Sequence, residues 1–306
     1  MSTSGDILLI GYPGDPTAQH VFAVANAINV PLAFLDIMDL ARGGGLEYTS
    51  DANGGSAVCA DGSTFRFDSF AGIYQRPFLP NRECLEEHRW AELASCVAAC
   101  VEILSCCKSR VVNRPFDGWE NGSKPLQTLL MTTAGLPVPP SIATSMLAEY
   151  RNFAHIGETV YKSNSAVRSI VNTVSGINEE RWESLANCPV YFQKRIIGPD
   201  VRIHLFRGEV FAVKIHSDAV DYRYWKAQGT HSRMEPFEDV PQQIVDACRR
   251  YAQSRCIALA GFDFKIDAGG NWYCLEMNPM PGFDAYDRVL DCRIATRLLQ
   301  WLRSGE

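Results

Sequence analysis

The stretch GFDFKIDAGGNWYCLEMNPMPGF, residues 261–283, predicts a β-hairpin near the end of the chain. Its centre is the pair Gly269 and Gly270, which can adopt the positive φ angles of a tight two-residue turn. Such a turn fixes which residues of the two strands lie opposite each other. Counted outward from the turn, the predicted pairs are Ala268 with Asn271, Asp267 with Trp272, Lys265 with Cys274, and Asp263 with Glu276.

Two carboxylates and a carboxamide share one face of this hairpin. Side chains alternate along a strand, so Asp263 and Glu276 face each other and Asn278 follows two residues farther along. The opposite face is apolar, which is typical of a sheet surface against a core. It carries Phe262, Phe264, Ile266, Tyr273, Leu275 and Met277.

The paired carboxylates allow two interpretations. Like charges opposite each other destabilise a sheet unless a cation lies between them. In one interpretation the face is solvated and Lys265 offsets the charge. In the other the face binds a divalent metal. Oxygen ligands without histidine or cysteine suit Mg²⁺, with Mn²⁺ as the alternative, and Mg²⁺ completes its shell with water and phosphate oxygens. The second interpretation predicts a nucleoside triphosphate.

Cations for such a polyphosphate are present along the second half of the chain, although each could also be an ordinary surface charge. The candidates are Lys124, Lys162, Arg168, Arg202 and Lys214. Lys162 ends an apolar strand and precedes the small polar loop SNSA, which could close over phosphates. Lys214 alternates with apolar residues in VFAVKIHS and shares a polar face with His216.

The two halves of the chain differ in their pattern. Strands over 6–11 and 32–37 flank a helix over 17–29, which predicts a parallel α/β lobe. A boundary is expected near residues 110–120. Beyond it, strand-rich segments with hairpin turns predict an antiparallel α+β region, closed by a final helix over 288–303.

Composition narrows the class of protein. The chain has 306 residues, 46% of them hydrophobic, and a net charge of −6, so it is long enough for two or three lobes and has no basic footprint for nucleic acid. No apolar run approaches the ~20 residues of a membrane span. Eleven cysteines without a CxxC pair argue against a zinc ribbon and favour a reducing, cytoplasmic setting.

Five segments in order resemble the ATP-grasp ligases, in particular the branch of a ribosomal-protein glutamate ligase and the microviridin-type peptide ligases. The resemblance covers roughly residues 111–287. The segments are SKPLQTLLMTTAGLPVPPS, VYKS, VYFQKRIIGPDVRIHLFRGEVFAVKIHS, DYR (221–223) and GFDF with LEMNPMPGF. Two features depart from the family. The loop after Lys162 lacks its usual glycines, and PMPGF is closer to the glutamate-ligase branch than to the microviridin type.

The resemblance implies an ATP-grasp fold of mixed α/β and α+β class. It implies an N-terminal α/β lobe over 1–113, a small lobe over 114–196, and a metal- and substrate-binding lobe over 197–306. Nucleotide contacts are implied for Lys124, Lys162, Arg168, Gln193, Lys194, Ile196 and Asp200. Phosphate or acyl-phosphate contacts are implied for Arg202 and Lys214, and Mg²⁺ ligation for Asp263, Glu276 and Asn278.

The activity implied is ATP-dependent amide or peptide bond formation between a carboxylate and an amine, through an acyl phosphate, on an amino acid or short peptide. Arg76, Arg114 and Arg223 are candidates for gripping a substrate carboxylate, or equally for structural ion pairs, and Gly282 lies in the turn expected at the substrate. Three alternatives remain open: a peptide-modifying maturase of a ribosomal precursor peptide, a small-molecule kinase on the same fold, and a nucleotide-binding regulator without turnover. Family members often associate, so a homo-oligomer is also an expectation.

Overall fold

The computed structural model describes residues 6–48, 54–77, 79, 86–164, 171–217 and 232–306. The chain divides into two compact units. The first comprises Met1–Asp117, Ile257–Leu259 and Met280–Glu306, and the second comprises Gly118–Cys256 and Ala260–Pro279. The division into three lobes stays a prediction.

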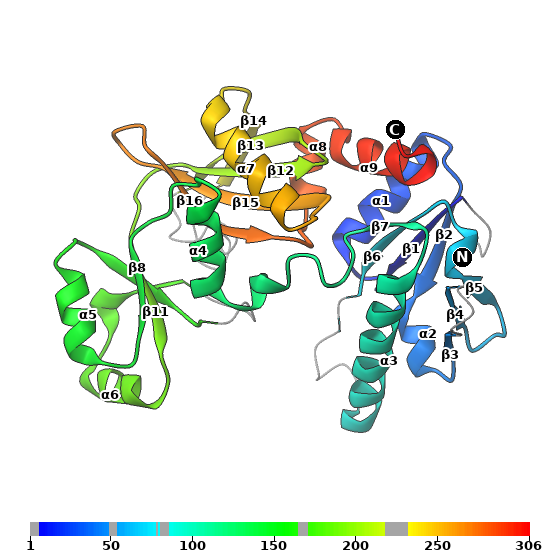
Figure 1. Ribbon diagram of the computed structural model, residues 1–306, viewed down its shortest axis with the longest axis horizontal. Coiled ribbons are helices and arrows are strands. Elements are labelled where there is room, and N and C mark those ends of the chain that lie inside the picture. Colours follow the sequence, from blue (N-terminus) through cyan, green and yellow to red (C-terminus); the bar gives the residue numbers. More distant parts are fainter. Residues whose placement is uncertain (1–5, 49–53, 78, 80–85, 165–170, 218–231) are drawn as a thin grey trace. The chain divides into compact units, whose positions relative to one another are not determined.

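The first unit is built on a four-stranded parallel sheet with the strand order β2-β1-β6-β7 (Figure 1). Strand β1 (Ile7–Gly11) is buried along its whole length because it is a central strand, paired in parallel with β2 (Leu32–Asp36) and β6 (Gly72–Arg76). Strand β7 (Arg110–Val112) forms an edge. The parallel α/β arrangement predicted for the start of the chain is therefore confirmed.

Helices and a small second sheet complete the first unit. The helices are α1 (Pro16–Ala27), α2 (Ile37–Ala41), α3 (Glu87–Cys106), α8 (Asp284–Val289) and α9 (Arg293–Ser304). The second sheet contains β3 (Gly45–Tyr48), β4 (Gly55–Val58) and β5 (Thr64–Arg66). The predicted helix over 288–303 is wrong in its first turn, because Asp291 and Cys292 adopt positive φ and separate α8 from α9.

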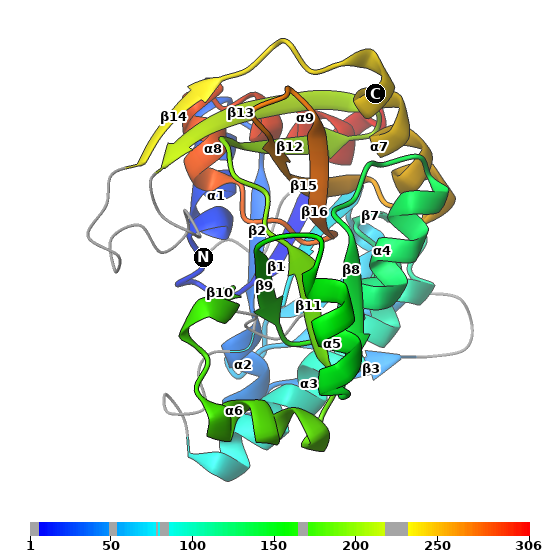
Figure 2. The ribbon, with the colours of Figure 1, turned by 90° about the vertical axis from the view of Figure 1, so that its left-hand side faces the viewer.

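The second unit contains two antiparallel sheets, as the pattern of the second half predicts. The smaller sheet has the order β10-β9-β11-β8, and its strands are β8 (Ser141–Thr144), β9 (Thr159–Lys162), β10 (Asn172–Thr173) and β11 (Val190–Lys194). Helices α5 (Leu147–Ala154) and α6 (Glu179–Glu183) pack on one face of it (Figure 2). Tyr150, Trp182 and Phe192 form the aromatic centre of that packing.

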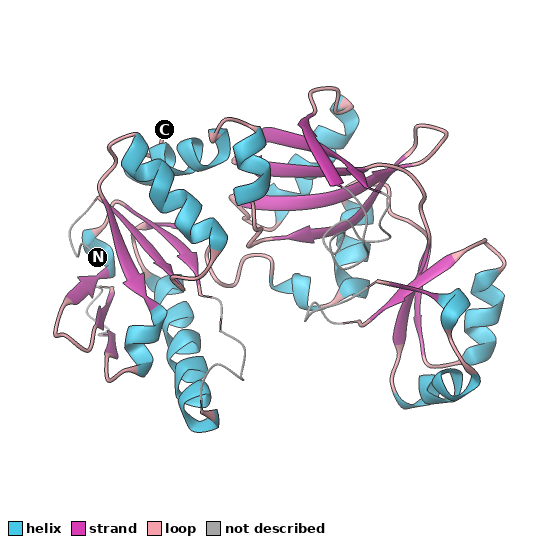
Figure 3. Cartoon of the chain, turned by 180° about the vertical axis from the view of Figure 1, so that it is seen from behind, coloured by secondary structure: helices cyan, strands magenta, loops and turns pink. Residues whose placement is uncertain are grey.

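The larger sheet of the second unit has the order β14-β13-β12-β15-β16. Its strands are among the magenta arrows of Figure 3. Its strands are β12 (Asp200–Phe206), β13 (Glu209–Ser217), β14 (Ser232–Pro236), β15 (Leu259–Ile266) and β16 (Trp272–Asn278). Helix α7 (Gln242–Ser254) covers one face, where Tyr251 meets Phe262 edge to face. Helix α4 (Lys124–Thr133) lies against the edge strand β16.

Candidate active site

The hairpin of β15 and β16 places the predicted oxygen ligands on one face of the larger sheet. Asp263 is the register partner of Glu276, and Gly261 is the partner of Asn278, as predicted. Asp263, Glu276 and Asn278 are all partly exposed, so solvent or a ligand can reach them. The central geometric prediction, two carboxylates opposite each other with an amide beside them, is confirmed.

The predicted register between these carboxylates and the turn is wrong. Phe264 pairs with Cys274, Lys265 with Tyr273, and Ile266 with Trp272. The turn is a five-residue loop over 267–271, not a two-residue double-glycine turn. The carboxylate of Asp267 holds this loop together by accepting the N–H groups of Gly269 and Asn271 at 2.9 and 2.8 Å.

A β-bulge at Leu275 brings the register back. Leu275 is the extra residue between Cys274, which faces Phe264, and Glu276, which faces Asp263. Cys274 therefore lies in the core, not on the polar face, and burial raises the pKa of its thiol well above the usual value. In a ladder without the bulge, Glu276 would turn to the core face. Bulges commonly re-aim a side chain in this way next to functional sites.

The side chain of Arg202 lies on the same face of the sheet as the carboxylates of Asp263 and Glu276. It donates from Nη1 to Oδ1 of Asp263 at 2.7 Å and from Nε to Nε2 of His204 at 3.3 Å. Because Nε2 of His204 accepts, the buried imidazole carries its proton on Nδ1. Lys265, the cation that the solvated-face interpretation requires, bonds instead to Asp200 at 2.9 Å and to the carbonyl of Gly198 at 3.2 Å. Arg202 is therefore a cation that bonds directly to the carboxylate pair of Asp263 and Glu276, through Asp263.

Gln127 of α4 supports β16 between the two predicted ligands of that strand. Its Nε2 donates to the carbonyl of Met277 at 2.8 Å, and its Oε1 accepts the N–H of Met277 at 3.1 Å. Met277 lies between Glu276 and Asn278 on an edge strand, so Gln127 takes the place of a further strand there. The sequence pattern gave no reason to single out this amide.

The predicted nucleotide contacts Lys162, Gln193 and Lys194 do not all lie on the same face of the smaller sheet. Lys162 is the register partner of Tyr191, and Gln193 that of Val160, so Lys162 and Gln193 share a face. This face is opposite the one that α5 and α6 cover, which carries Phe192. Nζ of Lys162 lies 5.4 Å from the centroid of the Tyr191 ring.

Lys194 falls on the other face of the smaller sheet. Its register partner is Thr159, whose hydroxyl bonds to Tyr150 of α5 at 3.1 Å. The structure therefore brings Lys162 and Gln193 together and leaves the side chain of Lys194 apart. The nucleotide role of Lys194 stays a prediction.

Lys214 and Arg202 lie on opposite faces of the larger sheet. Arg202 pairs with Val213, whereas Lys214 pairs with Val201 on one side and with Glu235 on the other. Nζ of Lys214 lies 5.6 Å from the ring centroid of Phe237. The two cations expected to share phosphate contacts are not brought together. Arg207 and Gly208, both with positive φ, form the two-residue turn between β12 and β13, and this turn sets the register of the two strands.

Three further nucleotide candidates are buried in the second unit. Lys124 is the first residue of α4, where Ser123 caps the helix by accepting the N–H of Leu126. Ile196 follows β11, and Asp200 begins β12 in its ion pair with Lys265. Lys124, Ile196 and Asp200 keep their predicted roles as proposals.

The substrate candidates of the first unit have structural partners. Arg76 is buried and bonds to Asp15, to the hydroxyl of Tyr74 at 3.3 Å and to the carbonyl of Pro281 at 2.8 Å. Gly282, the next residue, is exposed. Arg114 donates to three carbonyls at the end of α3 and the turn after it, namely those of Leu104, Ser105 and Ser109. Arg76 thus has the ion pair of the structural alternative, whereas the bonds of Arg114 go to backbone carbonyls, and a substrate role for either stays a prediction. Arg168 and Arg223 lie outside the described residues.

The donor set on the larger sheet fits Mg²⁺. Asp263, Glu276 and Asn278 offer hard oxygen atoms from adjacent antiparallel strands, and Arg202 orients the carboxylate of Asp263 through its bond to Oδ1. The ion pair of Arg202 and Asp263 is largely shielded from solvent, which strengthens the electrostatic attraction between the two side chains.

Comparison with known proteins supports the fold. No protein-family model and no curated protein matches the chain. Among solved structures, it is similar to the ATP-grasp ligase PsnB complexed with a phosphomimetic variant of its minimal precursor, Mg and ADP. That match has 24% identity, 98% of each chain covered and a TM-score of 0.80. The chain is also similar to the macrocyclase MdnC from Microcystis aeruginosa MRC, bound with precursor peptide MdnA, at 17% identity, 98% and 100% coverage and a TM-score of 0.77.

A more distant neighbour is the D-alanyl-alanine synthetase A from Vibrio cholerae, with 14% identity, 99% and 98% coverage and a TM-score of 0.60. Among the described residues, no helix combines the length and the apolar character needed to cross a membrane. Together, the paired carboxylates, the bulged hairpin and the match over almost the whole chain lead to one conclusion: this chain has the ATP-grasp fold.

Proposed function

We propose that this chain is an ATP-dependent ligase that joins a carboxylate to an amine on a peptide substrate. The observation that carries the proposal is the pairing of Asp263 with Glu276, with Arg202 bonded to Asp263. The pair is retained in a chain that resembles ATP-grasp ligases over 98% of its length. A regulator without turnover has no need of a complete set of metal ligands.

Each residue group has a role in this proposal. Asp263, Glu276 and Asn278 would hold Mg²⁺, which would neutralise phosphate charge and make the phosphorus easier to attack. Arg202 is oriented by two hydrogen bonds, so it can stabilise developing negative charge with little reorganisation. The remaining roles are phosphate contacts from Lys124 and Lys162, the adenine slot at Gln193, Lys194 and Ile196, and the ribose at Asp200.

The reaction is balanced as two displacements. A carboxylate oxygen attacks the γ-phosphorus of ATP, so that ADP leaves and an acyl phosphate forms. An amine then attacks the acyl carbon, phosphate leaves, and the amine gives up a proton as the amide forms. Phosphoryl transfer depends mainly on positioning and charge neutralisation, which is what this site offers.

A peptide is the substrate class that the similarities favour. PsnB and MdnC were solved with precursor peptides, and both are structurally nearer to this chain than the D-alanyl-alanine synthetase. The maturase alternative of the sequence analysis therefore becomes the preferred form of the ligase.

A reducing, cytoplasmic setting belongs to the same proposal, because every cysteine that the structure describes is a free thiol. Self-association stays an expectation from the family.

The proposal is tested by an ADP-release screen with Mg-ATP. The substrates are free amino acids, dipeptides, and peptides that carry both acidic side chains and lysine. We expect ADP release with peptides, together with a product that has lost one water for each bond formed, read by mass spectrometry. A stable phosphorylated product would instead indicate a kinase, and ADP release with free amino acids alone would refute the peptide substrate.

A further inference from the structure

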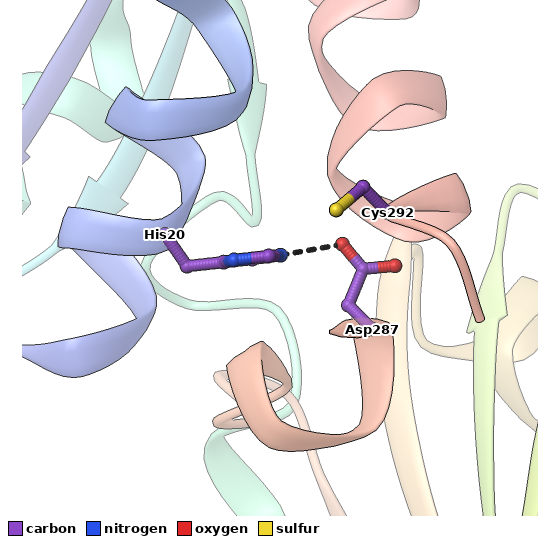
Figure 4. Close-up of side chains that lie close together, drawn as sticks. All are labelled: His20, Asp287 and Cys292. Carbon is purple, nitrogen blue, oxygen red and sulfur yellow. Dashed lines mark hydrogen bonds and ion pairs between the residues drawn. The ribbon is translucent and has the colours of Figure 1, made fainter. Parts of the chain in front are cut away.

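Three side chains with metal-binding atoms meet inside the first unit, and none of them belongs to the carboxylate hairpin. They are His20 of α1, Asp287 of α8, and Cys292, which immediately precedes α9 (Figure 4). One ligand atom from each lies within 4.8 Å of the others. His20 and Asp287 are buried, and Cys292 is partly exposed, which leaves a route to solvent.

The carboxylate of Asp287 is held in place from two sides. It caps α9, with Oδ1 accepting the N–H of Ile294 at 2.7 Å and Oδ2 accepting that of Ala295 at 3.0 Å. Oδ2 also lies 2.8 Å from Nε2 of His20. Both oxygens of this carboxylate accept hydrogen bonds, so the group that meets Oδ2 from His20 is the donor. Nε2 of His20 therefore carries the proton in this pair.

The cap does not require the particular chemistry of the other two side chains. Capping of α9 uses the two oxygens of Asp287; His20 adds a contact to Oδ2 that any hydrogen-bond donor could supply, and the thiol of Cys292 takes no part. The combination of imidazole nitrogen, carboxylate oxygen and sulfur is instead a ligand set that zinc accepts.

We propose that Nε2 of His20, an oxygen of Asp287 and Sγ of Cys292 form a Zn²⁺ site, with the fourth position left to water. Zn²⁺ would replace the proton between His20 and Asp287, and the imidazole would carry its proton on Nδ1. The thiol of Cys292 would release its proton to solvent on binding. The two helix N–H groups on Asp287 would serve as the outer hydrogen bonds that orient a ligating carboxylate.

Such a site would link α1 to α8 and α9, which are far apart in sequence. His20 and Asp287 are 267 residues apart, so a shared metal ion would tie the start of the chain to its end within the first unit. Its effect would be on the stability of that unit. This inference concerns residues outside the proposed ligase site and does not depend on the proposed activity.

The test is titration of the chelator-treated, full-length protein with Co²⁺, followed by displacement with Zn²⁺. We expect one equivalent of Co²⁺ to give a sulfur-to-cobalt charge-transfer band that Zn²⁺ removes. Cys292→Ser abolishes the band. His20→Gln keeps a donor for Asp287 and so keeps the fold, but it weakens binding by at least about 100-fold. Asp263→Asn retains the band, which separates this site from the ligase site.

Cys256→Ser is the matched control. Cys256 has φ 56° and Cys292 has φ 59°, so both are cysteines in the left-handed region, but Cys256 is exposed and belongs to the second unit. The control variant retains the band and its stoichiometry. Absence of the band in the unmodified protein, its persistence in Cys292→Ser, or unchanged affinity in His20→Gln would each overturn the proposal. Circular dichroism of the metal-free variants verifies that they are folded.

Discussion

Replacing Gln127 with leucine tests how the edge strand β16 is held at the metal face. The change removes both hydrogen bonds to Met277, of 2.8 and 3.1 Å, while leaving the side chain similar in size. The N–H and the carbonyl of Met277 then have no partner from α4. Because Met277 lies between Glu276 and Asn278, loosening it also loosens both predicted ligands.

The magnitude follows from the two lost bonds. Each leaves a buried backbone group unsatisfied, at about 1–3 kcal/mol, so the local free energy of opening at Met277 falls by about 2–6 kcal/mol. Even the lower figure makes exchange of the Met277 amide hydrogen at least about 30-fold faster. Residues that orient metal ligands from outside typically change affinity by about 10–100-fold, so the Mg²⁺ requirement for ADP release rises by that factor.

The assay is native-state hydrogen exchange at Met277, together with the Mg²⁺ dependence of ADP release. Gln253→Leu is the control, because Gln253 is an exposed amide on a helix of the same unit. The control leaves both quantities unchanged. Unchanged exchange at Met277 in Gln127→Leu would refute the supporting role. Fast exchange with an unchanged Mg²⁺ requirement would refute the link from β16 to the metal.

Two further substitutions and one labelling experiment have defined outcomes. Gly198→Ala places a Cβ 1.8 Å from a carbonyl oxygen of β15, so thermal unfolding shows the second unit destabilised by at least about 2 kcal/mol. The control Gly62→Ala also has a positive φ, of +85°, but open space around it, and it lowers the stability by only about 1 kcal/mol. Arg202→Lys loses the guanidinium that bonds to both Asp263 and His204, and it lowers kcat/KM for ATP by about 100-fold in steady-state kinetics. An effect below threefold would contradict the role of Arg202. Burial raises the pKa of the Cys100 thiol to about 12, so this thiol does not react with iodoacetamide at neutral pH while the protein is folded. Peptide mass spectrometry then shows labelling of the exposed Cys106 in the folded protein, and of Cys100 only after unfolding.

The sequence predicted the main elements of the site because they depend on short-range patterns. Alternation along the strands and a turn near Gly269 were sufficient to place Asp263 opposite Glu276. The detail between them was not predictable in the same way. Whether Leu275 is paired or bulged depends on the loop that Asp267 closes and on the packing of Cys274 in the core. Two compensating errors, in the turn and in the ladder, gave the correct facing residues.

Contacts that cross the chain account for the rest. Gln127 has no local signal, because its partner Met277 lies 150 residues farther along. The separation of Lys214 from Arg202 was, by contrast, readable from the two-residue turn between their strands, which sets the register. The resemblance had grouped these two cations by family role, without regard to the faces of the sheet on which they lie.

The central claim is that the bulged hairpin holds Mg²⁺ beneath the phosphates of ATP. The most direct measurement is calorimetric titration of ADP at a series of Mg²⁺ concentrations, for the unmodified protein, Asp263→Asn, Glu276→Gln and the exposed control Glu238→Gln. We expect Mg²⁺ to tighten ADP binding in the unmodified protein and the control, and the two ligand variants to need at least about 100-fold more Mg²⁺. Equal Mg²⁺ dependence in all four proteins would contradict the claim.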